Sequence, residues 1–570
     1  MQDYEHAVSF LGSWGPFQKR VFILLCFLSF PSGFNVMSVM FLLADPSHHC
    51  TVPLHWNLSQ DWVQASIPLQ QVNGHKEKSS CSRYPLDLIQ NLSALGVQPG
   101  WDLDLNQSAL GGGPGPVGLR VEGCEDGWSY SAEFYQSTVV TEFNLVCSDQ
   151  WKKPLSSLAY FVGGLCGCLF SGQISDWFGR KPVVFGSTII LSVFSAAMAF
   201  APSWPVFTLL YFVVGLGQIT SFIVAFVLGS EILVGGPRVL FSCLFLPVFY
   251  VAGEMLLPGT AYLVRNWRHL SLVMAVPGLA CIPLWWLIPE SPRWLASRGR
   301  LQEAELVLRA AALENRVDAP SVILQSVEKA EPEKAESLSF MDLLRTKNVR
   351  FTTLILWIVW FSNTVSYFGL SFNLSHLYGN PFLNYFLLSA VELPGYVASW
   401  LAARSLPRRL QFIMFALLGA LALLLILITM DSQPAVTLTL VLLGKFGVLG
   451  AAGGMYNYTG ELYPTGIRNT AMSSCAMFAR LGSAVSPYLL LLAAVDPVVP
   501  WVVVGSLCLL SVVLCILLPE TFRKPMPDSV QQMGHIQRFM FPWCSAPPKD
   551  DGKWSKEQTT APEIICTTRL

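Results

Sequence analysis

The chain has 570 residues, of which 52% are hydrophobic and 13% are charged, and its formal net charge at pH 7 is −1. A soluble protein carries about 25% charged residues, so the composition excludes an ordinary soluble domain and indicates a membrane protein that contacts lipid over most of its length. The sequence contains no basic tract of the kind that binds nucleic acid.

Long apolar runs predict the spanning helices. A spanning helix needs about 20 mainly apolar residues. The first run is too long for a signal peptide and lacks a small-residue cleavage site, so we interpret it as a helix. The sequence holds about twelve such runs, at 20–43, 152–175, 182–201, 204–229, 239–262, 270–288, 351–372, 381–403, 410–430, 435–458, 469–493 and 498–518. We therefore predict an all-α polytopic membrane protein with twelve transmembrane helices.

The short loops predict the orientation, since cytoplasmic loops carry an excess of Lys and Arg. That excess places both termini inside the cell. The predicted segments are a cytoplasmic N-terminus (1–19), the first helix (20–43), a large extracellular loop (44–151), helices two to six (152–288), a cytoplasmic linker (289–350), helices seven to twelve (351–518) and a cytoplasmic tail (519–570).

The 44–151 loop has the features of a segment exposed to an oxidising exterior. It contains three N-glycosylation sequons, at Asn57, Asn91 and Asn106. It also contains four of the fourteen cysteines, and we expect these to form disulfides. Four cysteines allow three pairings, and the sequence does not choose among them. The candidates are Cys50, Cys81, Cys124 and Cys147.

Three stretches of the chain recur at nearly one displacement. "SEILVGGPR" (Glu231, Arg238) is followed 230 residues later by "GELYPTGIR" (Glu461, Arg468). "LIPESPR" and "LLPETFR" repeat at the same displacement, and "GQISDWFGRK" corresponds to "WLAARSLPRR" at 228 residues. The helices therefore form two six-helix halves of the same topology. Parallel repeats of this kind place a substrate near the middle of the bilayer, between the halves.

The stretch "GQISDWFGRK" resembles the loop signature between the second and third helices of the major facilitator superfamily. We expect Gly172 and Gly179 to allow a close helix approach and a sharp turn. The charged residues are expected to form inter-helix pairs that hold the cytoplasmic side shut; the alternative is a plain cytoplasmic charge cluster. The gating candidates are Asp176, Arg180, Lys181, Glu231, Arg238, Glu290, Arg293, Arg408, Glu461, Arg468 and Glu520.

Nearly the whole chain resembles solute carrier family 22, the organic ion transporters. "FLGSWGPFQ", "EFNLVCSDQWKKPLSS", "WWLIPESPRWL" and "GELYPTGIRN" carry this resemblance, and "GQIT", "RNWRHL", "VELPGYVASW" and "LPRR" are most similar to its carnitine and zwitterion branch. The resemblance implies a multi-pass transporter of the plasma membrane. We expect Gln218, in "GQIT", to belong to the substrate site.

Arg480 interrupts an apolar run near the middle of the predicted eleventh helix. Arginine in the bilayer centre costs about 2.5–3.5 kcal/mol on insertion scales, and such residues usually face a cavity or a partner. In the resemblance, anion and carnitine transporters have arginine here, whereas cation-selective members have an acid. We predict that Arg480 binds a substrate carboxylate; the alternative is a buried structural pair.

Two further charges lie inside predicted helices, Glu392 in "VELPGY" and Lys445 in "GKFG". Together with Arg480 they sum to about one positive charge, which favours an anionic group. We take both as candidate substrate-binding residues. The alternative is a buried pair between Glu392 and one of the cations that orders the second half.

Aromatic faces attract quaternary ammonium groups, and helix seven has two aromatic residues seven positions apart, Trp360 and Tyr367. The resemblance places organic-ion contacts at these two positions. On spacing alone they are equally compatible with packing or lipid contact.

The sequence has no "GxxxxGK[ST]" phosphate loop, so we expect secondary rather than ATP-driven transport. Carnitine carriers of the resembling branch have Asn-Gly after the proline of helix one, whereas this sequence has "PSGFN". Ser32 and Asn35 offer oxygen ligands for a coupling Na⁺; alternatively, they hydrogen-bond between helices. We expect no other cofactor and no resident metal, because no metal-ligand spacing appears.

The sequence therefore predicts a carrier, not an enzyme, that moves small carboxylate-bearing zwitterions, carnitine-like, by alternating access. The alternative is a broad organic-anion or mixed-ion facilitator without sodium coupling. The chain ends in "TTRL", with a free carboxylate at Leu570 and a hydroxyl at Thr568. PDZ domains accept such termini, so a PDZ scaffold is a predicted partner; a tail without a binding partner is the alternative.

Overall fold

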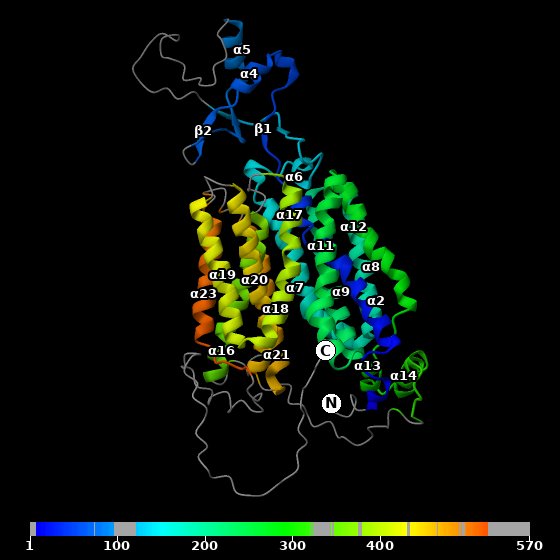
Figure 1. Cartoon of the computed structure of the whole chain (residues 1–570). Coiled ribbons are helices and arrows are strands. Elements are labelled where there is room, and N and C mark those ends of the chain that lie inside the picture. Colours follow the sequence, from blue (N-terminus) through cyan, green and yellow to red (C-terminus); the bar gives the residue numbers. More distant parts are fainter. Residues whose placement is uncertain are drawn as a thin grey trace.

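The computed structural model describes residues 7–72, 75–95, 121–320, 347–373, 379–429, 434–463, 465–489 and 498–522, together with a few isolated positions. Two helical bundles stand side by side, with a small domain on one side of them and short helices on the other (Figure 1). We call these the loop side, where the described residues of the 44–151 segment lie, and the linker side, where α13 (Pro292–Ser297) and α14 (Leu301–Asn315) lie.

The first bundle contains the helices before the linker. Its elements are α2 (Pro16–Val36) with α3 (Val39–Leu42), α7 (Lys152–Phe178), α8 (Arg180–Met198), α9 (Trp204–Ile232), α10 (Gly236–Leu240) running through the π-helical turn η4 (Phe241–Phe245) into α11 (Leu246–Leu263), and α12 (Trp267–Cys281) with η5 (Ile282–Trp286). Each apolar run predicted in this half is therefore a helix, with ends that differ by a few residues.

The second bundle repeats this order. It contains α16 (Lys347–Asn373), α17 (Pro381–Ala390) with α18 (Glu392–Ser405), α19 (Arg408–Thr429), α20 (Pro434–Leu462), α21 (Thr465–Val485) with η7 (Ser486–Tyr488), and α23 (Val499–Ile516). Within the described ranges, 11 helices are long and apolar enough to cross a membrane. The more polar α21, which carries Arg468 and Arg480, completes the predicted twelve.

A proline explains the break between α17 and α18. Pro394 has no backbone N–H and cannot bond to the carbonyl of Ala390. The helix is interrupted at Val391, and α18 begins at Glu392. The sequence thereby places a carboxylate in the first turn of a helix, where the helix dipole stabilises negative charge.

Glycines allow α7 and α9 to touch backbone to backbone. A Cβ atom added at Gly163 would lie 2.0 Å from the carbonyl oxygen of Phe212, and one at Gly215 would lie 2.0 Å from that of Tyr160. Small residues of this kind permit close helix packing where the surrounding lipid gives no hydrophobic drive. The expectation for Gly172 was wrong, since nothing lies within 4 Å of its added Cβ; Gly179 does make the predicted turn, with φ +106°.

The described residues of the loop-side domain form three antiparallel two-stranded sheets and short helices. The sheets pair β1 (His48–Cys50) with β6 (Trp128–Tyr130), β2 (Leu69–Val72) with β3 (His75–Lys78), and β4 (Ser82–Arg83) with β5 (Glu122–Gly123). The helices are α4 (Gln60–Ala65), α5 (Leu86–Ala94) and α6 (Val139–Glu142).

Two disulfides fix this domain, and they resolve the pairing that the sequence left open. Cys50 bonds to Cys124, and Cys81 bonds to Cys147. Two of the predicted sequons, Asn57 and Asn91, lie on exposed residues, as glycan addition requires. Asn106 lies outside the described residues.

We predict that Gly163→Leu prevents correct packing of α7 on α9, because the side chain must displace the Phe212 carbonyl. The variant should lose most of its surface abundance, and its detergent-solubilised fraction should unfold at a lower temperature than the wild type. Gly172→Leu on the same helix is the matched control, and it should behave like the wild type. Equal behaviour of the two variants would contradict this account of the α7–α9 contact.

Candidate substrate site between the two halves

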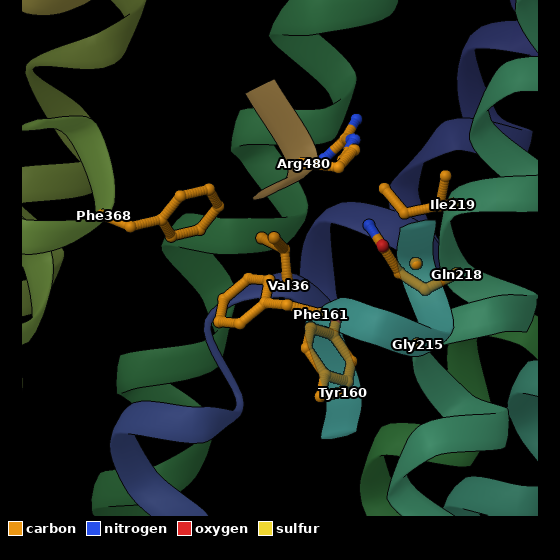
Figure 2. Close-up of a pocket in the computed structure, with 9 residues that line it drawn as sticks. Val36, Tyr160, Phe161, Gly215, Gln218, Ile219, Phe368 and Arg480 are labelled. Carbon is orange, nitrogen blue, oxygen red and sulfur yellow. The ribbon is translucent and has the colours of Figure 1, made fainter. Parts of the chain in front are cut away.

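A narrow pocket lies where the two halves meet. The first half contributes side chains from α2, α7 and α9, and the second half contributes Phe368 from α16 and Arg480 from α21 (Figure 2). The first-half lining residues are Val36, Tyr160, Phe161, Gly164, Gly215, Gln218 and Ile219. The pocket is mainly apolar, with one cation and one amide, and it lies where the parallel repeats predicted a substrate.

Arg480 supplies the positive charge of this pocket. Among the described residues, no carboxylate forms an ion pair with its guanidinium. Its charge instead acts on the hydroxyls of three tyrosines, Tyr160, Tyr250 and Tyr456. A buried arginine without an acidic partner is available to pair with an anionic ligand. The structural alternative for Arg480, a buried pair, is not what the described residues show.

Small residues make room for the guanidinium on α21. Ala476 and Ala484 lie one turn before and one turn after Arg480. A Cβ atom at Gly482 would lie 2.7 Å from the carbonyl oxygen of Phe361, so α21 approaches α16 closely at this level.

Gln218 lies in the pocket lining, as expected for a substrate-site residue (Figure 2). Its amide donates to the backbone oxygen of Ser32 at 3.1 Å and to the hydroxyl of Tyr250 at 3.3 Å. These bonds join α9 to α2 and α11, so they fix the position of the amide.

A second polar cluster lies in the second half. The Nζ atom of Lys445 is 3.1 Å from Oε1 of Glu392, and both side chains are almost fully buried. The same ammonium lies 3.0 Å from the hydroxyl of Ser371 and 3.2 Å from the ring centroid of Tyr367. Tyr367 donates its hydroxyl proton to Glu392 at 2.6 Å. The alternative in which Glu392 and a cation pair is therefore the observed arrangement; whether the pair also contacts substrate stays a prediction.

The cation–π contact assigns the face of Tyr367 to Lys445 in this conformation. Trp360 is 6% exposed, donates to Thr459 at 3.1 Å and packs edge-on against Tyr456. It does not line the pocket of Figure 2. The packing alternative therefore describes Trp360 here, and its predicted role in cation binding stays a prediction.

Sequence reasoning missed one intramembrane acid, Glu254 on α11. It is 1% exposed and accepts a hydrogen bond from Ser389 of the other half at 3.2 Å. Its signal was present in the sequence, since "YVAGEMLLP" places an acid in the middle of an apolar run.

Ser32 and Asn35 are fully buried and engaged in bonds between helices. Ser32 donates to the carbonyl of Gln218 at 3.2 Å, and Asn35 donates to those of Pro31 at 2.9 Å and Met274 at 3.4 Å. Ser195 donates to Oδ1 of Asn35 at 3.3 Å. This is the helix-bonding alternative considered above, and coupling to Na⁺ stays a prediction.

Aromatic residues close the two halves against each other on the loop side. Phe41 of α3 stacks on Phe382 of α17 with ring centroids 5.8 Å apart, and Phe161 of α7 meets Phe368 of α16 at 4.9 Å. Tyr456 lies near the linker end of α20, and its hydroxyl interacts electrostatically with Arg480 and with Cys168 of α7. The residue is 54% exposed. Accordingly, these ring contacts close the interface on the loop side.

The predicted gating residues of the first half form one network on the linker side. Arg180 pairs with Asp176 at 2.6 Å and with Glu231 at 3.0 Å. Glu290 accepts the backbone N–H groups of Arg180 at 3.1 Å and Lys181 at 3.2 Å, at the start of α8. Burial raises the pKa of Glu290, and these backbone donors act against that shift.

The second half repeats the network with equivalent residues. Arg408 pairs with Glu461 at 3.0 Å, and Glu520 accepts the backbone N–H groups of Arg408 at 2.9 Å and Arg409 at 3.0 Å. Arg238 and Arg468 donate to the carbonyls of Leu233 and Tyr463, at 2.8 Å and 3.3 Å, five residues earlier in each half. Arg293 is half-buried in α13. The pairs of Arg180 and Arg408 lie within one half, so they hold each half together.

Two six-helix halves of one topology around a central pocket define a secondary carrier of the major facilitator type. In agreement, the inward-open xylose transporter XylE from E. coli matches with a TM-score of 0.55 at 16% identity, covering 69% of this chain and 89% of that one. A family model described as "Sugar (and other) transporter" matches residues 129–529.

Closer relatives identify the family. Solute carrier family 22 member 4 of Mus musculus is 42% identical over 541 residues, 95% of this chain and 96% of the relative. Organic cation/carnitine transporter 2 of Rattus norvegicus is 44% identical over 539 residues, with 94% and 95% covered, and its Homo sapiens counterpart is 43% identical. The chain belongs to solute carrier family 22. It is a multi-pass membrane transporter and not an enzyme, as the sequence predicted.

The Lys445–Glu392 pair generates a stability prediction. Lys445→Met leaves Glu392 as a buried charge without its cation, and the loss of one partner of such a pair costs about 3–5 kcal/mol. The double variant Lys445→Met/Glu392→Leu removes both charges and should recover most of that loss. Thermal unfolding of the purified chain in detergent checks both results. A double variant less stable than Lys445→Met alone would show that the pair is not the source of the effect.

Proposed function

We propose that the chain is a plasma-membrane carrier of small zwitterions that bear a carboxylate, carnitine-like in chemistry, and that it works by alternating access with both termini in the cytoplasm. The observation that carries this proposal is the guanidinium of Arg480, which has no acidic partner among the described residues, in a pocket lined by both halves. A substrate carboxylate completes a charge-assisted hydrogen bond there, which is about twice as strong as a neutral one.

The zwitterion's cationic end needs a second contact. Phe161, Phe368 and Tyr160 present aromatic rings on the same pocket as Arg480 (Figure 2), and aromatic faces attract quaternary ammonium groups. The relatives named as organic cation/carnitine transporters support this substrate class. We further propose that Tyr367 and Glu392 contact the cationic end of the substrate, as the sequence predicted.

Arg480→Asp tests the proposal. We expect the variant to lose carnitine uptake and to gain uptake of simple organic cations, because the charge at the recognition point is reversed. Uptake of radiolabelled substrates is measured at equal surface abundance. Arg404→Gln, at the exposed linker end of α18, is the matched control and should transport like the wild type. Unchanged carnitine uptake by Arg480→Asp would refute the role of the guanidinium.

Facilitated transport without Na⁺ is the second candidate function, and the engaged side chains at Ser32 and Asn35 favour it. Their bonds to backbone oxygens would have to break before a cation could be held. Replacing external Na⁺ with N-methylglucamine should therefore leave carnitine uptake within about twofold. If uptake instead falls when Na⁺ is replaced, and Ser32→Ala removes this dependence on Na⁺, the result would support sodium coupling at this position.

The C-terminal "TTRL" lies outside the described residues, and we propose that it binds a cytoplasmic PDZ domain through its free carboxylate and Leu570. Deletion of the last three residues should leave transport intact and lower surface retention. Retention equal to that of the full chain would contradict this partner.

A further inference from the structure

Glu254 is a buried carboxylic acid that no part of the proposed recognition site uses. It lies on α11 of the first half and is 1% exposed. Ser389 of α17, in the second half, donates to its Oε1 atom at 3.2 Å. Its Oε2 atom is buried and, among the described residues, has no hydrogen-bond partner. A carboxylate in this state has lost its water without gaining an equivalent set of donors.

The charges that face Glu254 come from the second half. Glu392 of α18 repels its negative charge, and Lys445 of α20 attracts it. Lys445, however, is already paired with Glu392 at 3.1 Å. An ionised Glu254 would therefore make this group of three one negative charge in excess, in a region of low dielectric where unpaired charge is costly.

The remaining neighbours do not supply the missing charge. The helix that packs most closely on α11, α2, has only Lys19 and Arg20 as charged residues, at its linker end. The described part of α17 has no charged residue, and its titratable group is Tyr385. Three tyrosines also interact electrostatically with Glu254, and all three are neutral phenols: Tyr250 on α11, Tyr367 on α16 and Tyr396 on α18. In this conformation Glu254 is most stable with a proton on it.

The partners of Glu254 change when the carrier changes conformation. Ser389, Glu392 and Lys445 belong to the half opposite to α11, and the aromatic contacts that shut the loop side lie between these same halves. When the halves separate on the loop side, Glu254 loses these neighbours and gains water, which favours its ionised form. The protonation of this acid is thus linked to which side of the carrier is open.

We propose that Glu254 binds a proton as the two halves close on the loop side and that this proton crosses the membrane with the substrate. In the loading step, a proton from loop-side water joins the carboxylate and forms the carboxylic acid. In the release step the O–H bond breaks and the proton passes to water on the linker side. The hydroxyl of Tyr250, one helical turn before Glu254, bonds to Gln218 in the pocket lining and offers an exit.

A proton fits this site better than a metal cation does. Hard cations such as Ca²⁺ take about six to eight oxygen ligands. Among the described residues, the structure brings here the Oε2 atoms of Glu254 and Glu392, which have no hydrogen-bond partner, and the hydroxyl of Ser389. A proton needs one oxygen only.

The test uses the full chain purified into proteoliposomes, with radiolabelled L-carnitine as the probe, and it rests on the proposed function. An inward proton gradient of one pH unit should accumulate carnitine above its external concentration, by at most about tenfold for one proton per substrate. A proton carrier that dissipates the gradient should abolish this accumulation. Because accumulation is set by the gradient, the result does not depend on how the protein is oriented in the vesicle.

Glu254→Gln should exchange carnitine at equal pH on both sides but accumulate none. Glu303→Gln, on the exposed surface of α14 where Glu303 pairs with Arg300, is the matched control and should accumulate like the wild type. Accumulation by Glu254→Gln equal to that of the wild type overturns the proposal. The proposal is also overturned if the wild type exchanges carnitine but does not accumulate it in response to the proton gradient. It is likewise overturned if the wild type accumulates carnitine in response to a Na⁺ gradient and Glu254→Gln removes that response.

Exchange at equal pH separates the two claims, because a wild type that exchanges no carnitine contradicts the proposed substrate instead. If Glu254→Gln is inactive, Ser389→Ala decides. It keeps the acid and removes the donor that stabilises its charged form. The pH of half-maximal uptake should then rise by about half a unit to one unit, and an unchanged profile overturns the proposal.

Discussion

The positive charge of Arg480 lies between the halves and has no acid paired with it in the part of the chain that the structure describes. It is the constraint on which the rest of the arrangement depends. The other intramembrane cation, Lys445, is neutralised within its own half by Glu392. The charge of Arg480 acts on the phenol groups of three tyrosines, and no described carboxylate pairs with it. Among the intramembrane residues that the structure describes, Arg480 is the one cation without an acidic partner, and it lies between the two halves. This position is suited to binding an anionic group that contacts both halves at once.

The two linker-side networks explain how the halves can move without coming apart. Arg180, Glu231 and Glu290 join three segments of the first half, and Arg408, Glu461 and Glu520 do the same in the second. Each half is thereby stiffened internally, and motion is left to the interface. That interface consists of ring contacts, pocket residues and the Ser389–Glu254 bond, which can form and break at a lower cost than ion pairs in lipid.

The sequence predicted the helices well, because a run of about 20 apolar residues has few alternatives in a membrane. The repeat in the sequence also predicted that Arg180 corresponds to Arg408 and Glu231 to Glu461, and the ion pairs of the two halves agree with this. Three features depended on the folded chain. The disulfide pairing depends on how the loop-side domain folds, Gly172 turned out to face open space, and Trp360 packs against Tyr456. Spacing along one helix does not tell which neighbour lies opposite, so these could not be derived from the sequence.

Binding of three related ligands to the purified wild-type chain tests the central claim most directly. The ligands are L-carnitine, its primary amide, which has the same shape without the carboxylate charge, and acetylcarnitine, which retains that charge. The account predicts that the amide binds at least about tenfold more weakly, since a charge-assisted bond of about 1.5–3 kcal/mol is lost, whereas acetylcarnitine binds within a few fold of carnitine. Equal affinity for carnitine and its amide would show that Arg480 does not recognise the substrate carboxylate, and it would contradict the account.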